Sequence, residues 1–255
     1  MKVFITGASS GIGEALAVYY AGKGATLGLV ARRRAVLDEL KLRLGGQHVC
    51  YALDVTDAPA LHVAAGDFMG RFGAPDIVIA SAGVSAGTLT ECEEDLEAFR
   101  RIMDTNVFGM AATFAPFIPA MKLGGGERRL VGIASVAGIR GLPGAEAYSA
   151  SKAAAIAYLE SLRLEMRPSG IKVVTIAPGY IETPMTAVNP YKMPFLLPAG
   201  QAAERFAAAI RLGTSYAVIP WPMGVVAKLL RLMPNWLYDR LFTNAPRKPR
   251  GLLRD

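Results

Sequence analysis

Two side chains near the middle of the chain are spaced for acid–base chemistry. Tyr148 and Lys152 lie four residues apart in the run YSASK, so both would point to one face of a helix. A phenol has an ordinary pKa near ~10 and is a poor acid–base group at neutral pH. A neighbouring ammonium favours the phenolate and would lower that pKa. The pair therefore predicts proton transfer, with Tyr148 as the acid or base.

Ser135 strengthens this interpretation. It lies 13 residues before Tyr148, directly after an apolar stretch typical of a buried strand. Its hydroxyl would therefore lie at a strand end, where it could hydrogen-bond a substrate carbonyl and hold it close to Tyr148. On its own, a Tyr-x3-Lys pair is more often part of a solvated helix face. The serine is what favours a catalytic site.

A glycine-rich loop close to the N-terminus predicts a dinucleotide site. The run TGASSGIG follows a short apolar stretch and precedes a helical pattern. Gly7 would allow a tight turn, Gly11 a close approach of the backbone to a pyrophosphate, and Gly13 close packing of helix on strand. The N–H groups and dipole of the helix N-terminus would then favour phosphate. The alternative is a glycine-rich turn that only connects a strand to a helix. The expected phosphate-binding residues are Gly7, Ser9, Ser10, Gly11, Ile12 and Gly13.

The residues after the next apolar stretch indicate which dinucleotide binds. Folds that use NAD place an acidic residue at the end of the second strand, whereas Arg there accepts the 2′-phosphate of NADP. That position holds Arg32, Arg33 and Arg34, and the next acid is Asp38, inside the following helical stretch. Arginine forks match phosphate geometry. We expect NADP(H) in preference to NAD(H), bound by Arg32 and Arg33; the alternative is a solvated, basic helix start.

The bulk composition fits one large domain. The chain has 255 residues, 52% of them hydrophobic, and a net charge of +7, much of it in segments 32–34 and 247–250. An anionic cofactor and an anionic membrane surface explain this charge more locally than nucleic acid does. Cys50 and Cys92 are expected to be reduced thiols, and the lack of a Cys/His cluster predicts no metal site. The first strand leaves no room for a signal peptide, so a cytoplasmic protein is expected.

Short apolar runs alternate with longer helical patterns along the chain. This rhythm predicts an α/β fold: a doubly wound parallel sheet of about seven strands, the Rossmann fold. The expected strands are Lys2–Thr6, Thr26–Ala31, His48–Asp54, Asp76–Ala80, Arg129–Ser135, Lys172–Ala177 and Tyr216–Pro220. The expected helices are Gly11–Gly22, Arg33–Leu44, Ala58–Phe72, Glu93–Lys122 (as two helices meeting near Asn106), Ala147–Arg167 and Ala202–Leu212.

The last third of the chain is expected to serve the substrate. Residues 1–220 would form the catalytic domain, including a lid at 180–212. Four prolines in the stretch 184–198 forbid a regular helix there, and the Met, Tyr, Phe and Leu side chains of this region indicate an apolar substrate. Residues 221–255 would form an apolar helical extension with a basic tail. Three roles stay open for the extension: to cover the pocket, to form an oligomer interface, or to lie on a membrane surface.

The chain resembles the short-chain dehydrogenase/reductase family over nearly its whole length. The resemblance rests on the loop TGASSGIG, on the Ser135, Tyr148 and Lys152 set, and on further residues at matching places. It implies that Asn106 completes the catalytic set by holding a proton-relay water, and that Lys152 also binds ribose hydroxyls. The motif Asn-Asn-Ala-Gly of the family is ASAG here, so both amides are missing. The further cofactor-binding residues implied are Asp54, Val55, Ala82, Gly83, Tyr148, Lys152, Pro178, Gly179, Ile181 and Thr183.

The resemblance implies an oxidoreductase that transfers hydride between a nicotinamide and a carbonyl or secondary alcohol. An apolar or lipid-like small molecule is the expected substrate, and a homodimer or homotetramer the expected assembly. Peripheral membrane contact through the extension is a further interpretation, whereas nucleic acid is not an expected partner. The alternative is a non-catalytic NADP(H)-binding regulator or scaffold of the same fold.

Overall fold

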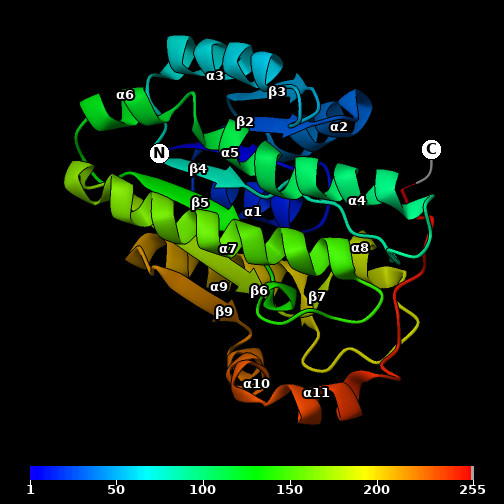
Figure 1. Cartoon of the computed structure of the whole chain (residues 1–255). Coiled ribbons are helices and arrows are strands. Elements are labelled where there is room, and N and C mark those ends of the chain that lie inside the picture. Colours follow the sequence, from blue (N-terminus) through cyan, green and yellow to red (C-terminus); the bar gives the residue numbers. More distant parts are fainter. Residues whose placement is uncertain (254–255) are drawn as a thin grey trace.

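Seven parallel strands form one sheet in the computed structural model, which describes residues 1–253 (Figure 1). The strand order is β3-β2-β1-β4-β5-β6-β9, so the chain switches from one side of β1 to the other between β3 and β4. Ligands of doubly wound sheets bind at such a switch point, beyond the carboxyl ends of the strands. The strands are β1 Lys2–Thr6, β2 Thr26–Ala31, β3 His48–Ala52, β4 Ile77–Ala80, β5 Arg129–Ile133, β6 Lys172–Pro178 and β9 Tyr216–Ile219.

Helices cover both faces of the sheet, which is why its strands are apolar on both sides. Side chains of α1 (Gly11–Gly22), α2 (Arg34–Leu44) and α9 (Ala199–Leu212) build the core on one face. The other core is built by α3 (Ala58–Phe72), α5 (Gly109–Phe114), α6 (Ile118–Leu123) and α7 (Glu146–Met166), with α4 (Asp95–Met103) packed on α7. The doubly wound α/β fold is therefore confirmed.

Several expected boundaries were wrong. Two strands end earlier than predicted, so Asp54 and Ser135 lie in the loops that follow β3 and β5. The long segment 93–122 contains three α-helices, and α4 and α5 are joined by a π-helical turn, Asp104–Phe108. The helix α9 was included in the expected lid, but its Phe206 and Ile210 are fully buried against the sheet. The lid is therefore shorter, and it contains β7 (Ile181–Glu182), α8 (Pro184–Ala187) and β8 (Leu197–Pro198).

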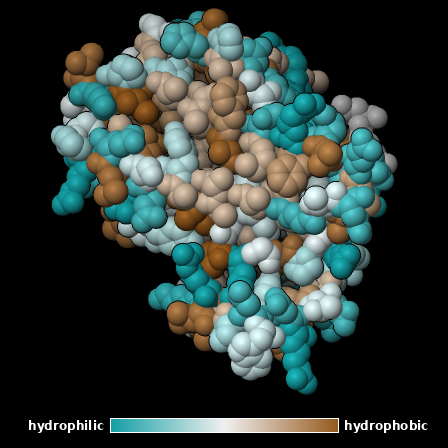
Figure 2. Space-filling view, in the orientation of Figure 1, coloured by the Kyte–Doolittle hydropathy of each residue, from teal (hydrophilic) through white to brown (hydrophobic). Residues whose placement is uncertain are grey.

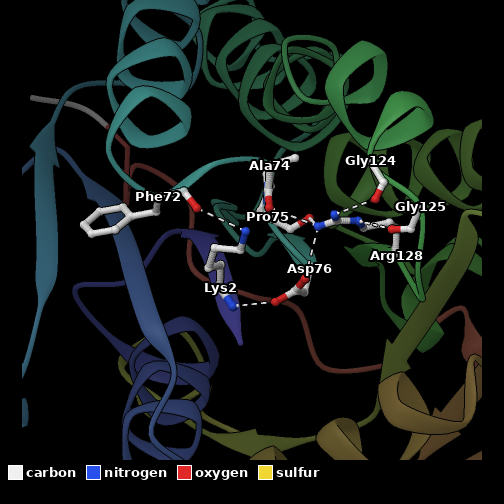
Figure 3. Close-up of polar contacts among 8 residues, drawn as sticks. All are labelled: Lys2, Phe72, Ala74, Pro75, Asp76, Gly124, Gly125 and Arg128. Atoms are coloured by element: carbon white, nitrogen blue, oxygen red, sulfur yellow. Dashed lines mark hydrogen bonds and ion pairs between the residues drawn. The ribbon is translucent and has the colours of Figure 1, made fainter.

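A polar network connects neighbouring strands at the amino-terminal end of the sheet, opposite to the carboxyl ends of the strands (Figure 3). The Arg128 guanidinium donates to the carbonyls of Ala74 and Pro75 at 3.0 and 2.7 Å, and to Asp76 Oδ1 at 3.0 Å. Asp76 Oδ2 accepts in turn from the backbone N–H of Lys2 at 2.7 Å. These bonds join the starts of β1, β4 and β5, so they hold three central strands in register without entering the functional end of the sheet.

The C-terminal extension stands apart from the sheet as a lobe below the body of the molecule (Figures 1 and 2). It consists of α10 (Trp221–Leu232) and α11 (Asn235–Phe242), and residues 243–253 then return toward α4. Arg140 fixes the lobe: its guanidinium donates to the Leu230 and Met233 carbonyls at 2.7 and 2.6 Å and lies over the Tyr238 ring. Within residues 1–253, none of the helices has the length and apolar character needed to cross a bilayer.

Candidate active site

One cleft at the carboxyl ends of the strands gathers the residues that the sequence marked for a cofactor. It lies at the switch point between β1 and β4. Every expected cofactor residue lines it, although these residues come from six separate segments of the chain. The set is Gly7, Ser9, Ser10, Gly11, Ile12, Gly13, Arg32, Arg33, Asp54, Val55, Ala82, Gly83, Tyr148, Lys152, Pro178, Gly179, Ile181 and Thr183.

The glycine loop fits a pyrophosphate because its glycines carry no side chains that would cover the backbone. Gly7 has φ +70°, and a Cβ there would lie 2.7 Å from the Ala82 backbone. A Cβ on Gly13 would lie 2.2 Å from the Gly7 carbonyl oxygen, so no side chain fits between loop and helix. Ser10, the N-cap of α1, makes no side-chain capping bond within the described residues. The first N–H groups of α1 therefore face the cleft ready for an anion.

Two of the three consecutive arginines flank the cleft. Arg33 Nη2 donates to the Ser9 carbonyl and to Ser9 Oγ, both at 3.2 Å, so it lies directly beside the phosphate loop. Arg32 Nη1 lies 3.8 Å from Asp54 Oδ2, and 55% of its side chain is exposed. Arg34 turns away and pairs with Asp38 on α2. This arrangement concentrates positive charge where the second strand ends.

Ser135, Tyr148 and Lys152 meet at the inner end of the cleft. Ser135 Oγ accepts a hydrogen bond from the Ala137 N–H at 3.1 Å, which holds the hydroxyl at the start of its loop. Burial raises the pKa of Tyr148, and a hydrogen bond with Ser135 opposes this rise. Burial also lowers the pKa of Lys152 to about 8. Burial therefore shifts both pKa values in the direction that favours the neutral form of each group.

The expected effect of Lys152 on Tyr148 is not what this structure shows. Lys152 Nζ donates to the Ile133 carbonyl at 2.8 Å and lies 5.8 Å from the centre of the Tyr148 ring. The ammonium is thus bound to a strand-end carbonyl, and the cost of burying a phenolate dominates the pKa of Tyr148. The prediction that Lys152 lowers this pKa overlooked desolvation. Burial therefore favours the neutral phenol of Tyr148.

Asn106 lies behind the cleft, fully buried in the π-helical turn. Its Oδ1 accepts from the Val84 N–H at 2.8 Å, and its Nδ2 donates to the Val84 carbonyl at 3.0 Å and to Ser151 Oγ at 2.9 Å. The extra residue of a π-turn explains how a helix directs this amide at the loop after β4. Ser151 was not among the expected site residues, although it lies inside the YSASK run.

Thr6 compensates in part for the amides missing from the ASAG run. Its hydroxyl donates to the Ile79 carbonyl at 3.5 Å and accepts from the Ala82 N–H at 3.4 Å. These long bonds link the ends of β1 and β4, where the absence of the amides had put the sheet-stabilising bonds in doubt. Its position directly before Gly7 was the signal for this role.

Two tyrosines of the lid segment contact each other and were missed as a pair. The rings of Tyr180 and Tyr191 meet edge to face, with centres 6.5 Å apart. Burial raises the pKa of Tyr191, and the neighbouring phenols of Tyr180 and Tyr148 raise it further. The lid thus places an aromatic pair close to the Tyr148 phenol.

The sequence profile of the short chain dehydrogenases matches residues 1–193. The chain belongs to the short-chain dehydrogenase/reductase family. An uncharacterized oxidoreductase of Myxococcus xanthus is 38% identical over 241 residues, which cover 92% of this chain and 93% of that protein. An alcohol dehydrogenase of Thermococcus sibiricus, solved with 5-hydroxy-NADP, has a TM-score of 0.76 at 26% identity and covers 86% of this chain and 95% of its own. A 3-ketoacyl-(acyl-carrier-protein) reductase of Brucella melitensis, solved with NADH, has a TM-score of 0.76 at 27% identity, with coverages of 85% and 94%.

This membership confirms the resemblance seen in the motifs. The short-chain dehydrogenase/reductase described here is an oxidoreductase that uses a nicotinamide nucleotide. The two solved relatives hold different nucleotides: one holds a derivative of NADP and the other holds NADH. Family membership therefore does not decide between the two nucleotides, and the arginines at the cleft are the residues that bear on this question.

Proposed function

We propose that this enzyme is an NADP(H)-dependent carbonyl reductase or secondary-alcohol dehydrogenase. The observation that carries the proposal is the convergence of a glycine-rich loop and the Ser135, Tyr148 and Lys152 set in one cleft, with Ser135 and Lys152 buried and Tyr148 partly exposed. When bound, the nicotinamide supplies or accepts the hydride. The protein contributes geometry and a proton.

Each residue of the set has a role that its surroundings support. Ser135 is anchored by the Ala137 N–H, so its hydroxyl can orient and polarise a carbonyl. Tyr148, neutral because it is buried, gives its proton to the carbonyl oxygen during reduction and recovers a proton afterwards. Lys152 is fit to bind ribose hydroxyls, since its ammonium is held at the cleft wall. Asn106 holds the loop after β4 in place and donates a hydrogen bond to Ser151 of the YSASK run.

The arginines support NADP(H) over NAD(H). Arg33 lies against Ser9 of the phosphate loop, and Arg32 stands where an acid would serve a ribose 2′-hydroxyl. Asp54 shares the neighbourhood but belongs to the loop after β3 and pairs with Arg32. A 2′-phosphate would find two guanidinium groups there.

An apolar substrate is supported by the walls on the lid side. Met185 lines the cleft, and the Tyr180–Tyr191 pair lies close to Tyr148. The Brucella relative bears the name of a 3-ketoacyl reductase, which agrees with an extended apolar chain. Steroid-like and long-chain ketones are therefore the first substrates to try.

NADPH oxidation at 340 nm against 2-alkanones of graded length tests the proposal, with Tyr148→Phe as control. We expect turnover that increases with chain length and is lost in the variant, while NADPH binding persists. Turnover limited to short ketones would remove the apolar-substrate part. Tight NADPH binding without any turnover on alkanone, 3-ketoacyl and steroid ketones would favour the regulator interpretation instead.

We propose further that the outward face of the extension rests on an anionic membrane surface. Along α10, Trp221, Leu229 and Leu232 share one stripe and are 75%, 61% and 81% exposed. Lys228 and Arg231 lie beside this stripe, so a symmetric second copy would bring like charges together, whereas lipid phosphates would attract them.

Vesicle flotation tests this contact with full-length protein. We expect recovery with vesicles that contain anionic lipid, and loss of recovery when Trp221, Leu229 and Leu232 are all changed to Ser. Exchanging the exposed Leu42 for Ser on α2 is the matched control. Equal recovery of the native protein, the triple variant and the Leu42 variant would overturn the membrane proposal. A native dimer that becomes monomeric in the triple variant would also overturn it.

A further inference from the structure

A segment near the C-terminus forms a strap beside the substrate end of the cleft. We define the C-terminal strap as residues 247–253, which follow the lobe and return along the body to the start of α4 (Figure 1). The Pro249 carbonyl accepts from the Gly87 N–H at 2.9 Å, and Arg250 pairs with Gly87 as an isolated parallel bridge. The Leu253 carbonyl accepts from Arg101 at 2.9 Å, and its side chain packs against a buried cluster around Ile102.

The body of the enzyme is shaped to receive this strap. A Cβ on Gly87 would lie 2.2 Å from the Lys248 carbonyl oxygen, and one on Gly144 would lie 2.9 Å from the Arg247 side chain. Arg250 pairs with Asp95, whose carboxylate is almost fully buried, and with Glu94. Arg250 of the basic tail therefore has carboxylate partners within the molecule.

Lys248 joins two walls of the cleft. Its Nζ donates to Ser85 Oγ and to the Met185 carbonyl, both at 3.1 Å. Met185 lines the cleft from the lid side, and Val84, the neighbour of Ser85, lines it from the loop after β4. Burial lowers the pKa of Lys248 to about 8, in keeping with an ammonium that binds neutral acceptors.

The lid segment depends on such outside contacts. Met185 belongs to α8, which has only four residues and is too short to be stable by itself. Its local support is the capping box between Thr183 and Thr186 at its start. Beyond α8, the lid runs through 188–196 without regular structure. The bond from Lys248 is therefore a tie between a weakly supported segment and the rigid sheet.

We propose that Lys248 is a positioning residue that ties the lid to the loop after β4 and so sets the shape of the substrate end of the cleft. This inference rests on the proposed function only for its consequence in catalysis. The C-terminal strap then determines substrate selection, while cofactor binding depends mainly on the glycine loop and the arginines, which Lys248 does not contact in the described part of the chain. Loss of the tie would loosen the lid without disturbing the glycine loop.

Two changes break the tie in different ways. Lys248→Met removes the ammonium but keeps the length of the side chain, and Gly87→Ala pushes the C-terminal strap away through a clash with its backbone. Lys248→Arg is the conservative variant that could keep both bonds. Lys122→Met, on the exposed end of α6, is the matched control. Melting temperatures identify any variant that fails to fold.

Two readouts separate this inference from the proposed function. The first is trypsin cleavage after the exposed Lys192 in the lid, followed by mass spectrometry, which needs no turnover. We expect cleavage about tenfold faster in Lys248→Met and Gly87→Ala, with near-normal protection in Lys248→Arg and Lys122→Met. The second is kinetics with the 2-alkanone that the native enzyme turns over best. There we expect KM to rise about five- to tenfold in the two tie variants, with kcat and NADPH affinity within about twofold of normal.

The outcomes are distinct. Native cleavage rates at Lys192 in both tie variants would overturn the inference, whatever the activity. Faster cleavage with unchanged KM would show that the tie orders the lid but does not position substrate, and would overturn the catalytic part. A parallel fall in NADPH affinity would mean a general loss of structure and would also overturn it. Absence of turnover in the native enzyme would count against the proposed function, and the cleavage result would still decide the tie.

Discussion

The nucleotide preference should depend on two of the three consecutive arginines. Changing Arg32 and Arg33 together to Ser removes both guanidinium groups from the cleft but leaves Arg34, which pairs with Asp38 on the helix surface. The double variant should therefore lose its preference for NADPH, whereas Arg34→Ser should behave as the native enzyme does.

The size of the loss follows from the exposure of these side chains. Arg32 is 55% exposed, and the bonds from Arg33 to Ser9 are also solvent-exposed. Two unit charges 4 Å apart attract by about 1 kcal/mol in water and by about 4 kcal/mol at the lower effective dielectric constant near a protein surface. Half-exposed partners belong near the lower limit, at about 1 to 1.5 kcal/mol each. Two contacts then correspond to about 30- to 150-fold in kcat/KM.

Steady-state kinetics with both nucleotides provide the measurement. We expect kcat/KM for NADPH to fall by about 30- to 150-fold in the double variant and kcat/KM for NADH to stay within about threefold. The NADPH preference of the native enzyme should also weaken with added salt, since the contacts are partly exposed. If the double variant still prefers NADPH as strongly as the native enzyme, the assignment of the arginines to the 2′-phosphate is wrong.

Three further predictions concern the catalytic set and the sheet edge. Tyr148→Phe should lower kcat by about 10²- to 10⁴-fold with unchanged NADPH affinity, measured by turnover and fluorescence titration; retained turnover would exclude Tyr148 as the proton donor. Lys152 has its pKa lowered from 10.5 to about 8, so between these values the unfolded chain binds a proton that the native protein lacks, and stability due to this group rises with pH. In urea unfolding, the native enzyme should therefore gain stability relative to Lys152→Met from pH 8 to pH 10; a constant difference would contradict the lowered pKa. Arg128→Met should cost about 3 kcal/mol of unfolding free energy because five acceptors lose their donor, whereas Arg100→Met, at an exposed pair, should cost little.

The cofactor half of the cleft was predictable because it is built from strand ends. A parallel sheet brings the residues that follow its strands to one edge, so Gly7, Asp54 and Ser135 had to meet once the strands were recognised. Small errors in strand boundaries did not matter here, since a residue just after a strand lies at the same edge as one at its end.

The electrostatics and the tail could not be predicted in the same way. Spacing put Lys152 and Tyr148 on one helix face, but it could not show that the ammonium binds the Ile133 carbonyl or that burial dominates both pKa values. Likewise, Lys248 and Arg250 have partners more than 60 and 150 residues away along the chain. A basic run has the composition of a solvated tail, and only tertiary structure reveals its acceptors.

This contrast bears on how far kinship can specify function. The family profile ends at residue 193, so it spans the glycine loop and the catalytic set but neither the lobe nor the C-terminal strap. The segments that we propose to face the substrate are irregular or short, namely the lid with its four-residue α8 and the strap, and Lys248 bonds to the lid through the Met185 carbonyl. Hydride chemistry can therefore be shared across the family while the substrate differs, because the sheet positions the reacting groups and the short or irregular segments shape the space around them.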